Sequence, residues 1–167
     1  ERQRNRAEHE LRPRRVDEVV RAAPRAIVEV HDREGIALPR RRAEKRRVFG
    51  QSWLYVGHES EVSEPGCFVR RKVAWRPVIM VRDDDGKIRV LYDTCPHRGN
   101  TVCREASGKT RRFQCFYHGW SFNTRGELVA TPDPDGYGPG FDRGKHGLAS
   151  PPRVETYHGL IFMSLKP

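Results

Sequence analysis

Two short segments that each combine a cysteine with a histidine constrain this chain more than any other feature of its sequence. The first has the pattern C-x-H at 95–97, the second has the pattern C-x-x-H at 115–118, and 17 residues lie between them. Cysteine and histidine at such short spacing are typical of metal ligands. The chain has four cysteines and no charged-then-apolar start of the signal-peptide type, so a disulfide framework is not expected.

The order of the ligands indicates which kind of metal site to expect. Structural zinc sites usually pair cysteine with cysteine and histidine with histidine, whereas each segment here is mixed. A binuclear iron–sulfur cluster explains the mixture, with Cys95 and Cys115 on one iron and His97 and His118 on the other. We therefore predict a [2Fe–2S] cluster that passes single electrons. A zinc site or a chance grouping is the alternative.

Neighbouring residues suit loops that wrap around a cluster. Gly99 and Gly119 let the backbone come close to sulfur, where amide N–H groups can donate hydrogen bonds. We expect Tyr117 and Trp120 to shield the site from water. Arg98 is a candidate to bind a partner's carboxylate where electrons leave, and a plain surface arginine is the equally weighted alternative.

The sequence after Gly50 predicts a mainly β fold. Short runs rich in Val, Ile, Tyr, Phe and Trp alternate with Gly, Pro and Asp, and hairpin turns are expected at 84–87 and 123–126. Many short strands favour an antiparallel β-sandwich or a small barrel. The Pro/Gly-rich segment 131–153 is expected to be a loop that covers something or moves. The expected strands are 52–57, 66–71, 77–82, 87–92, 111–115, 120–123, 128–130 and 160–165.

The first 49 residues differ in composition from the rest of the chain and are expected to form a basic, partly helical extension before a domain at 50–167. A helical turn is expected near 16–20, a strand at 27–30 and a helix over 38–49 that ends at Gly50. The formal net charge of +10 would suit an acidic protein partner, or only a solvated face. Nucleic acid is not expected, because the arginine runs lack interleaved aromatic residues.

No apolar stretch is long enough to span a bilayer. Because no export signal is visible either, we expect a cytoplasmic protein without a membrane partner.

The text around the two motifs resembles the Rieske domain of the large (α) subunit of aromatic ring-hydroxylating oxygenases. The resemblance covers about half of the chain, is highly specific, and continues more weakly over 150–165. It implies the Rieske fold, an antiparallel β-sandwich with two cluster-binding loops. Besides both motifs, the matching stretches are 53–60, 65–66, 81–82, 85–87, 103–104, 112–115, 120–122 and 126–128.

This resemblance implies a terminal oxygenase component. In the family the Rieske cluster receives electrons from a ferredoxin or reductase. It passes them to a mononuclear Fe(II) that two histidines and a carboxylate hold in a separate catalytic domain. We expect that domain to be absent from this chain, which would be a truncated α subunit or would rely on another polypeptide. Expected partners are the electron donor, the catalytic domain or a neighbouring α subunit, and a β subunit.

A stand-alone Rieske ferredoxin is the main alternative. The N-terminal preface, the 53–60 stretch and the His-Gly-Trp at 118–120 favour the oxygenase pattern. A nucleic-acid-binding zinc module ranks far behind. Cys67 and Cys103 are expected to be free, packed thiols. None of the other histidines is paired with a carboxylate in a way that suits the catalytic iron. His58 is expected to be buried and structural, and His146 and His158 are expected on the surface. The remaining two are His9 and His31.

Overall fold

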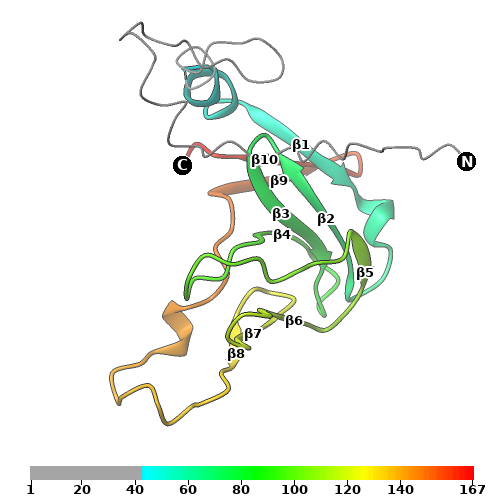
Figure 1. The fold of residues 1–167 in the computed structure, drawn as a ribbon. Coiled ribbons are helices and arrows are strands. Elements are labelled where there is room, and N and C mark those ends of the chain that lie inside the picture. The colour runs from blue at the N-terminus through cyan, green and yellow to red at the C-terminus, as the bar shows by residue number, and fades with distance from the viewer. Residues whose placement is uncertain (1–42) are drawn as a thin grey trace, which may run out of the picture. The chain divides into compact units, whose positions relative to one another are not determined.

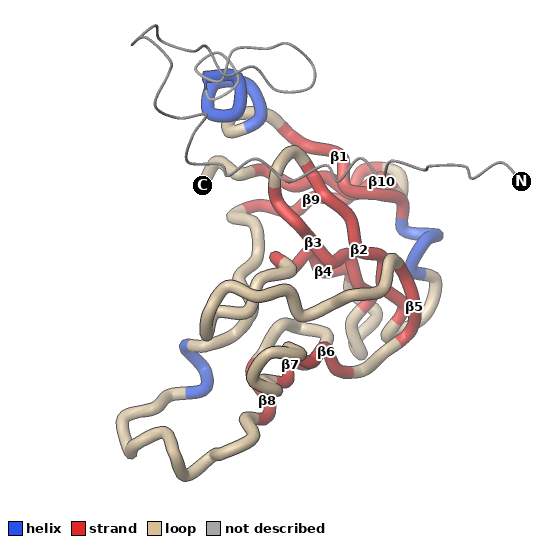
Figure 2. The backbone as a smooth tube through the Cα atoms, viewed as in Figure 1, coloured by secondary structure: helices blue, strands red, loops and turns tan. Residues whose placement is uncertain are grey.

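A computed structural model of the protein describes residues 43–167. These residues form three antiparallel sheets, so the predicted mainly β fold is confirmed (Figures 1 and 2). No helix in this part of the chain is long and apolar enough to cross a membrane. The elements are η1 (Lys45–Phe49), β1 (Trp53–His58), η2 (Glu59–Val62), β2 (Cys67–Val73), β3 (Arg76–Arg82), β4 (Ile88–Tyr92), β5 (Ser107–Lys109), β6 (Arg112–Gln114), β7 (Ser121–Asn123), β8 (Leu128–Ala130), η3 (Arg143–Lys145), β9 (Arg153–Tyr157) and β10 (Leu160–Ser164).

The four-stranded sheet, with the order β4-β3-β2-β5, lies between the sheets β1-β10-β9 and β6-β7-β8 (Figure 1). Alternate residues of a strand face opposite sides of its sheet, and β3 is buried on both. Val78 and Met80 pack into one hydrophobic cluster, whereas Ile79 and Val81 pack into another. The middle sheet therefore has a core on each face, and the core around Ile79 also contains both cysteines of the two motifs.

The predicted N-terminal elements lie mostly outside the described residues. This applies to the turn near 16–20, to the strand at 27–30 and to the first part of the helix over 38–49. Its last part is present as η1, and the Gly50 N–H donates to the Lys45 carbonyl at 2.8 Å, which confirms the predicted end.

Two strands were not predicted from the sequence. Strand β5 reads Ser-Gly-Lys, is exposed throughout and pairs with β2, so it lacks the apolar alternation by which a strand is recognised. Strand β9 overlaps the end of the segment expected to be a loop. It forms a hairpin with β10 through His158 and Gly159, which have φ of 47° and 80°.

Asp83 organises the turn between β3 and β4. Its buried carboxylate accepts hydrogen bonds from the backbone N–H groups of Asp85 and Lys87, at 2.9 and 2.8 Å, and from Arg89 Nε at 2.8 Å. Burial raises the pKa of Asp83, but Arg89 and the two N–H groups outweigh it and hold the pKa below its ordinary value. Gly86 has φ of 79°, as the predicted hairpin turn requires.

The Asp83→Asn variant is expected to lose about 1–2 kcal/mol of unfolding free energy, because Arg89 loses its charged partner and is itself partly exposed. In the unmodified chain this contribution is fully present above the pKa of the unfolded aspartate, about 3.9, and is lost as pH falls through the lower folded pKa. Urea unfolding at pH 7 and at pH 3 measures both. Asp84→Asn, at an exposed position in the same turn, is the control; an equal loss in both variants would contradict the assignment.

Candidate metal centre

The two Cys-His segments fold into loops with the same backbone hydrogen bonds. We call residues 95–100 the first loop, which follows β4, and residues 115–120 the second loop, which joins β6 to β7. In each loop the cysteine N–H donates to the carbonyl five residues later, and the glycine four residues after the cysteine donates its N–H back to the cysteine carbonyl. The four distances are 2.7 to 2.8 Å. One type of turn therefore presents both cysteines, although the histidine comes second after the cysteine in one loop and third in the other.

The glycines that close these turns have the same backbone conformation but different surroundings. Gly99 and Gly119 have φ of 73° and 69°, where a side chain is strained. A Cβ at Gly119 would lie 2.7 Å from Pro132 Cγ, whereas a Cβ at Gly99 would meet no described atom within 4 Å.

We expect Gly99→Ala to lower the unfolding free energy by about 1 kcal/mol, from backbone strain alone. Gly119→Ala should cost about 2 kcal/mol, because its Cβ also displaces Pro132. Urea unfolding of the two variants isolates the steric part, since each serves as the control for the other. Equal losses would show that Pro132 does not restrict the second loop.

The two loop cysteines bring their thiols together inside the core. Cys95 and Cys115 are each 2 % exposed. Burial raises the pKa of the Cys95 thiol, the backbone N–H groups of His97 and Arg98 lower it by donating to the sulfur, and the adjacent Cys115 thiol raises it. A cation bound between two buried sulfurs would stabilise both as thiolates.

The two loop histidines also lie side by side. The ring centroids of His97 and His118 are 4.6 Å apart, and both residues are half-buried. Nδ1 of His97 is buried and has no hydrogen-bond partner within residues 43–167. Burial lowers the pKa of His97, and His118 and Arg98 lower it further, which favours the neutral imidazole that binds metals. A metal ion is one explanation for a buried nitrogen left without a partner.

These donors fit a [2Fe–2S] cluster of the Rieske type. Such a cluster needs two thiolates at one iron and two imidazoles at the other, and the loops supply one adjacent pair of each. Across residues 43–167, no three His, Cys, Asp or Glu side chains are grouped as ligands of a single ion. Two protein ligands per iron do not require such a group.

The aromatic residues predicted to shield the site are placed differently from each other. Trp120 is 2 % exposed, and its ring stacks on His97. Tyr117 contacts the His118 ring, with centroids 3.8 Å apart, but it is 55 % exposed, as its neighbour Phe116 is at 56 %. Tyr117 therefore shields one face of His118 rather than the whole site. Arg98 is exposed on the first loop.

The Pro/Gly-rich segment 131–153 covers the second loop, so the first of its two predicted roles is correct. The Tyr137 hydroxyl accepts a hydrogen bond of 2.8 Å from Trp120 Nε1, and the rings of Phe141 and His146 also pack on Trp120. The expectation that His146 is a surface residue is therefore only partly met. Its ring is half-buried in this aromatic group, with its centroid 4.6 Å from that of Phe141.

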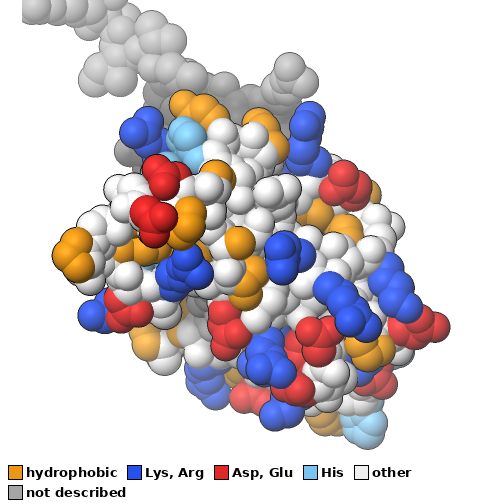
Figure 3. All heavy atoms as spheres, turned by 90° about the horizontal axis from the view of Figure 1, so that it is seen from below, with side chains coloured by type: hydrophobic (Ala, Val, Ile, Leu, Met, Phe, Trp, Pro, Cys, Tyr) orange, Lys and Arg blue, Asp and Glu red, His pale blue; other side chains and the backbone are white. Residues whose placement is uncertain are grey.

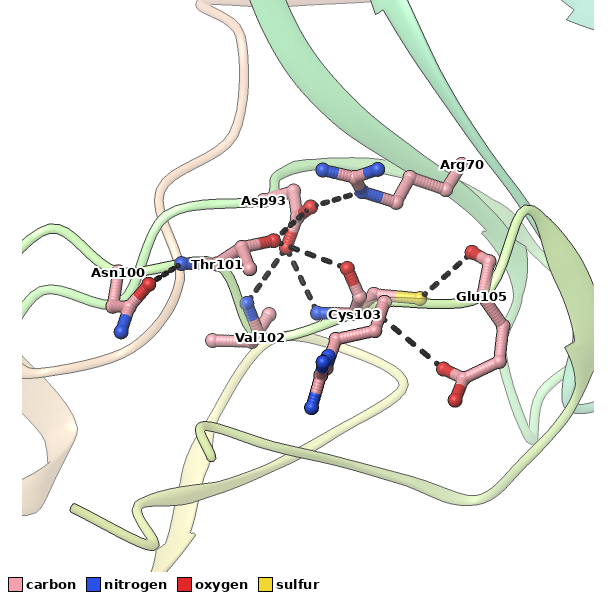
Figure 4. Close-up of polar contacts among 8 residues, drawn as sticks. Arg70, Asp93, Asn100, Thr101, Val102, Cys103 and Glu105 are labelled. Carbon is pink, nitrogen blue, oxygen red and sulfur yellow. Dashed lines mark hydrogen bonds and ion pairs between the residues drawn. The ribbon is translucent and has the colours of Figure 1, made fainter. Parts of the chain in front are cut away.

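Sequence reasoning missed Asp93, which holds the chain on either side of the first loop (Figure 4). Its buried carboxylate accepts hydrogen bonds from Arg70 Nε and Thr101 Oγ1, both at 2.5 Å, and from the N–H groups of Val102 and Cys103, at 2.8 and 2.9 Å. The hydrogen bond to Asp93 raises the pKa of Arg70 above its ordinary value. Asp93 thus connects β2 to the segment that follows the first loop.

The two cysteines outside the loops are free thiols, as predicted. Cys103 is 2 % exposed, and its Sγ lies 3.5 Å from the Glu105 carbonyl oxygen (Figure 4). Burial, followed by the charge of Asp93, raises the pKa of Cys103 to about 11. Cys67 is half-buried. Cys103 is therefore protonated at neutral pH, and Cys67 packs against the other hydrophobic cluster, the one that contains Met80.

The remaining described histidines have structural positions. His58 is half-buried rather than buried, and its ring caps η2 by accepting a hydrogen bond of 3.2 Å from the Ser60 N–H. His158 is exposed in the turn between β9 and β10, as predicted. His9 and His31 lie outside the described residues.

Comparisons with known proteins agree with this geometry. The family model for the Rieske [2Fe-2S] domain matches residues 52–158. The chain is 44 % identical over 125 residues to the α subunit of N,N-dimethyl phenylurea N-demethylase from Sphingobium sp. (strain YBL2), covering 74 % of this chain and 27 % of that protein. It is 42 % identical over 119 residues to the α subunit of biphenyl 2,3-dioxygenase from Rhodococcus jostii (strain RHA1), covering 71 % and 26 %.

The fold is shared with solved oxygenase structures as well. The crystal structure of naphthalene 1,2-dioxygenase from Rhodococcus sp. bound to indole superposes with a TM-score of 0.72 at 40 % identity, over 74 % of this chain and 28 % of that one. The chain spans about a quarter of the length of the relatives it matches. The chain belongs to the Rieske [2Fe–2S] domain family, and its relatives include the α subunits of ring-hydroxylating dioxygenases.

Proposed function

We propose that Cys95, His97, Cys115 and His118 bind a Rieske [2Fe–2S] cluster, and that the chain relays electrons within the terminal oxygenase component of an aromatic ring-hydroxylating dioxygenase. One observation carries the proposal. Two loops with the same backbone hydrogen bonds place two buried thiols together and two imidazoles together, and the buried Nδ1 of His97 has no partner in the described part of the chain.

When bound, such a cluster supplies a one-electron couple at a higher potential than an all-cysteine cluster. The chain's own residues would bind this cluster, tune it and shield it from water. The N–H groups of His97 and Arg98 donate to the Cys95 sulfur and would stabilise its thiolate form when the cluster is bound. Trp120 and the core around it exclude water from the thiol side. The half-buried imidazoles of His97 and His118 form the edge through which electrons would enter and leave.

The oxygenation chemistry is proposed to take place outside these 167 residues. The relatives of which this chain covers about a quarter include dioxygenase α subunits, and the matching part is the Rieske domain. We propose that residues 50–167 form this domain after an extension at 1–49. A mononuclear iron would then be supplied by a catalytic domain or a neighbouring α subunit. The proposed donor is a ferredoxin or reductase, and a β subunit is a further candidate partner.

The histidine edge carries features suited to docking an acidic donor. Arg98 is exposed beside His97, and the Arg104 guanidinium lies 4.9 Å from the centroid of the Phe116 ring, which is 56 % exposed. On the face seen in Figure 3, Lys and Arg side chains are interspersed with Asp and Glu rather than gathered in one patch. The docking proposal therefore rests on these two arginines and not on the net charge of +10.

Reduction of the chain by an acidic ferredoxin is expected to slow severalfold between low and physiological ionic strength. Added salt screens the attraction between opposite charges on the two proteins when these charges are about a Debye length or more apart. Stopped-flow reduction at several salt concentrations measures this rate. Arg98→Gln should weaken the dependence, and Arg143→Gln, an exposed arginine in η3, is the control. A reduction rate that salt does not change would contradict docking through charge.

The first experiment is the ratio of iron to acid-labile sulfide in the purified protein, together with the intact mass of every chain present. About two irons and two sulfides on this chain alone would support a separate electron-transfer unit, as in a stand-alone Rieske ferredoxin. About three irons to two sulfides with a longer or second chain would support a complete oxygenase. Zinc without sulfide would refute both readings and favour a zinc module.

A further inference from the structure

The strongest feature that the proposed function does not use is the contact between Trp120 and His97. The two rings are nearly parallel, with an interplanar angle of 6° and centroids 4.7 Å apart. Trp120 belongs to the second loop and His97 to the first, so this stack joins the two loops. Parallel rings at this separation form an offset stack, in which the plane of one ring restricts the plane of the other.

Trp120 is itself held by groups outside both loops. It is 2 % exposed, and its Nε1–H donates a hydrogen bond of 2.8 Å to the hydroxyl of Tyr137, in the segment that covers the second loop. Phe141 and His146 meet the indole edge-on, with centroids 5.7 and 5.9 Å away and interplanar angles of 66° and 78°. Of these three neighbours, Tyr137 makes the directional contact.

The hydroxyl oxygen of Tyr137 is the hydrogen-bond acceptor of the buried indole N–H. Trp120 has a single side-chain donor, and a buried donor without an acceptor is costly. If the tyrosine oxygen were removed, the indole would turn to find water or another acceptor. Because His97 lies flat against the indole, its ring would lose the surface that fixes its plane.

We propose that Tyr137 is a positioning residue for the His97 imidazole and acts through its hydrogen bond to Trp120. This inference rests on the proposed function, in which His97 is a ligand of the cluster. Tyr137 does not touch that ligand. It holds the indole plane, and the indole plane holds the imidazole in one orientation relative to the iron that it would bind. A single orientation gives a single, narrow electronic environment, whereas a ring free to tilt gives a distribution of environments.

The test uses the purified chain with its iron and sulfide, and its readout is the electron paramagnetic resonance spectrum of the reduced cluster. Tyr137→Phe keeps the ring and removes only the oxygen. It is expected to retain two irons and two sulfides per chain while its resonances broaden and shift. Tyr157→Phe, at a tyrosine that is 67 % exposed on β9, is the matched control and should give the unmodified spectrum.

A double substitution separates positioning from a general loosening of the covering segment. Trp120→Phe keeps an aromatic face for His97 but has no N–H to donate, so adding Tyr137→Phe to it should cause no further broadening. An unmodified spectrum for Tyr137→Phe, equal broadening in Tyr157→Phe, or full additivity in the double variant would each overturn the inference. These outcomes leave the proposed function intact, because they require a cluster. An unmodified chain without iron and sulfide would refute the proposed function together with the inference.

Discussion

Replacing His118 with cysteine is expected to leave an iron–sulfur cluster in place and to lower its reduction potential by on the order of 100 mV or more. His118 is the proposed ligand from the second loop, and its ring lies 4.6 Å from that of His97. A neutral imidazole leaves the iron less electron-rich than a thiolate does, so the added negative charge of a cysteine ligand favours the oxidised state. Potentials of all-cysteine clusters lie well below those of Rieske clusters for this reason.

A redox titration followed by visible absorption measures the potential, and iron and sulfide assays show how much cluster remains. His158→Cys is the control, since it changes a histidine in an exposed turn between β9 and β10. An unchanged potential in His118→Cys, with the cluster retained, would remove His118 from the ligand set.

The Asp93→Asn variant is expected to have the largest effect on stability, a loss of about 3–4 kcal/mol of unfolding free energy. The carboxylate accepts four hydrogen bonds, two of them on the oxygen that faces Arg70 and Thr101. An asparagine could keep its oxygen on the N–H groups of Val102 and Cys103. Its NH2 group would then face the donors of Arg70 and Thr101, with which it cannot form the same hydrogen bonds. Most of the lost unfolding free energy would come from the buried polar groups left without a partner. The ion pair itself contributes less, because the Arg70 side chain is 35 % exposed.

Urea unfolding of the iron-free and the iron-loaded protein measures this loss. Asp135→Asn, in an exposed part of the covering segment, is the control and should change stability by less than about 0.5 kcal/mol. We also expect Asp93→Asn to bind less iron, because Thr101 to Cys103 directly follow the first loop. A stability equal to that of the control would show that the four hydrogen bonds do not hold this segment.

The sequence predicted those parts of the fold in which local pattern and tertiary contacts agree. The β3–β4 hairpin was predicted because apolar runs flank a turn with Gly86, and the structure adds a buried carboxylate at Asp83. Strand β5 was missed because its three residues are all exposed and it exists through pairing with β2. Its register depends on a partner about forty residues away, which no local pattern records.

The site shows the same division. Two cysteines and two histidines at short spacing predicted the paired donors, because these residue types are themselves the usual metal ligands. Asp93 was missed because its partners are spread from Arg70 to Cys103, and one aspartate before a cysteine carries no spacing signal. Tyr137 and His146 were missed because a Pro/Gly-rich stretch suggests a loop but does not indicate what the loop covers.

The matching hydrogen bonds of the two loops have a consequence for how such motifs tolerate insertions and deletions. In both loops the cysteine and the glycine four residues later close the turn, while the histidine occupies a different position within it. The backbone thus fixes where the sulfur lies, and the histidine position adjusts only the reach of the ring. We expect related chains to tolerate a histidine moved by one residue inside the turn. They should not tolerate a residue gained or lost between cysteine and glycine, so a search for distant relatives should keep that interval constant.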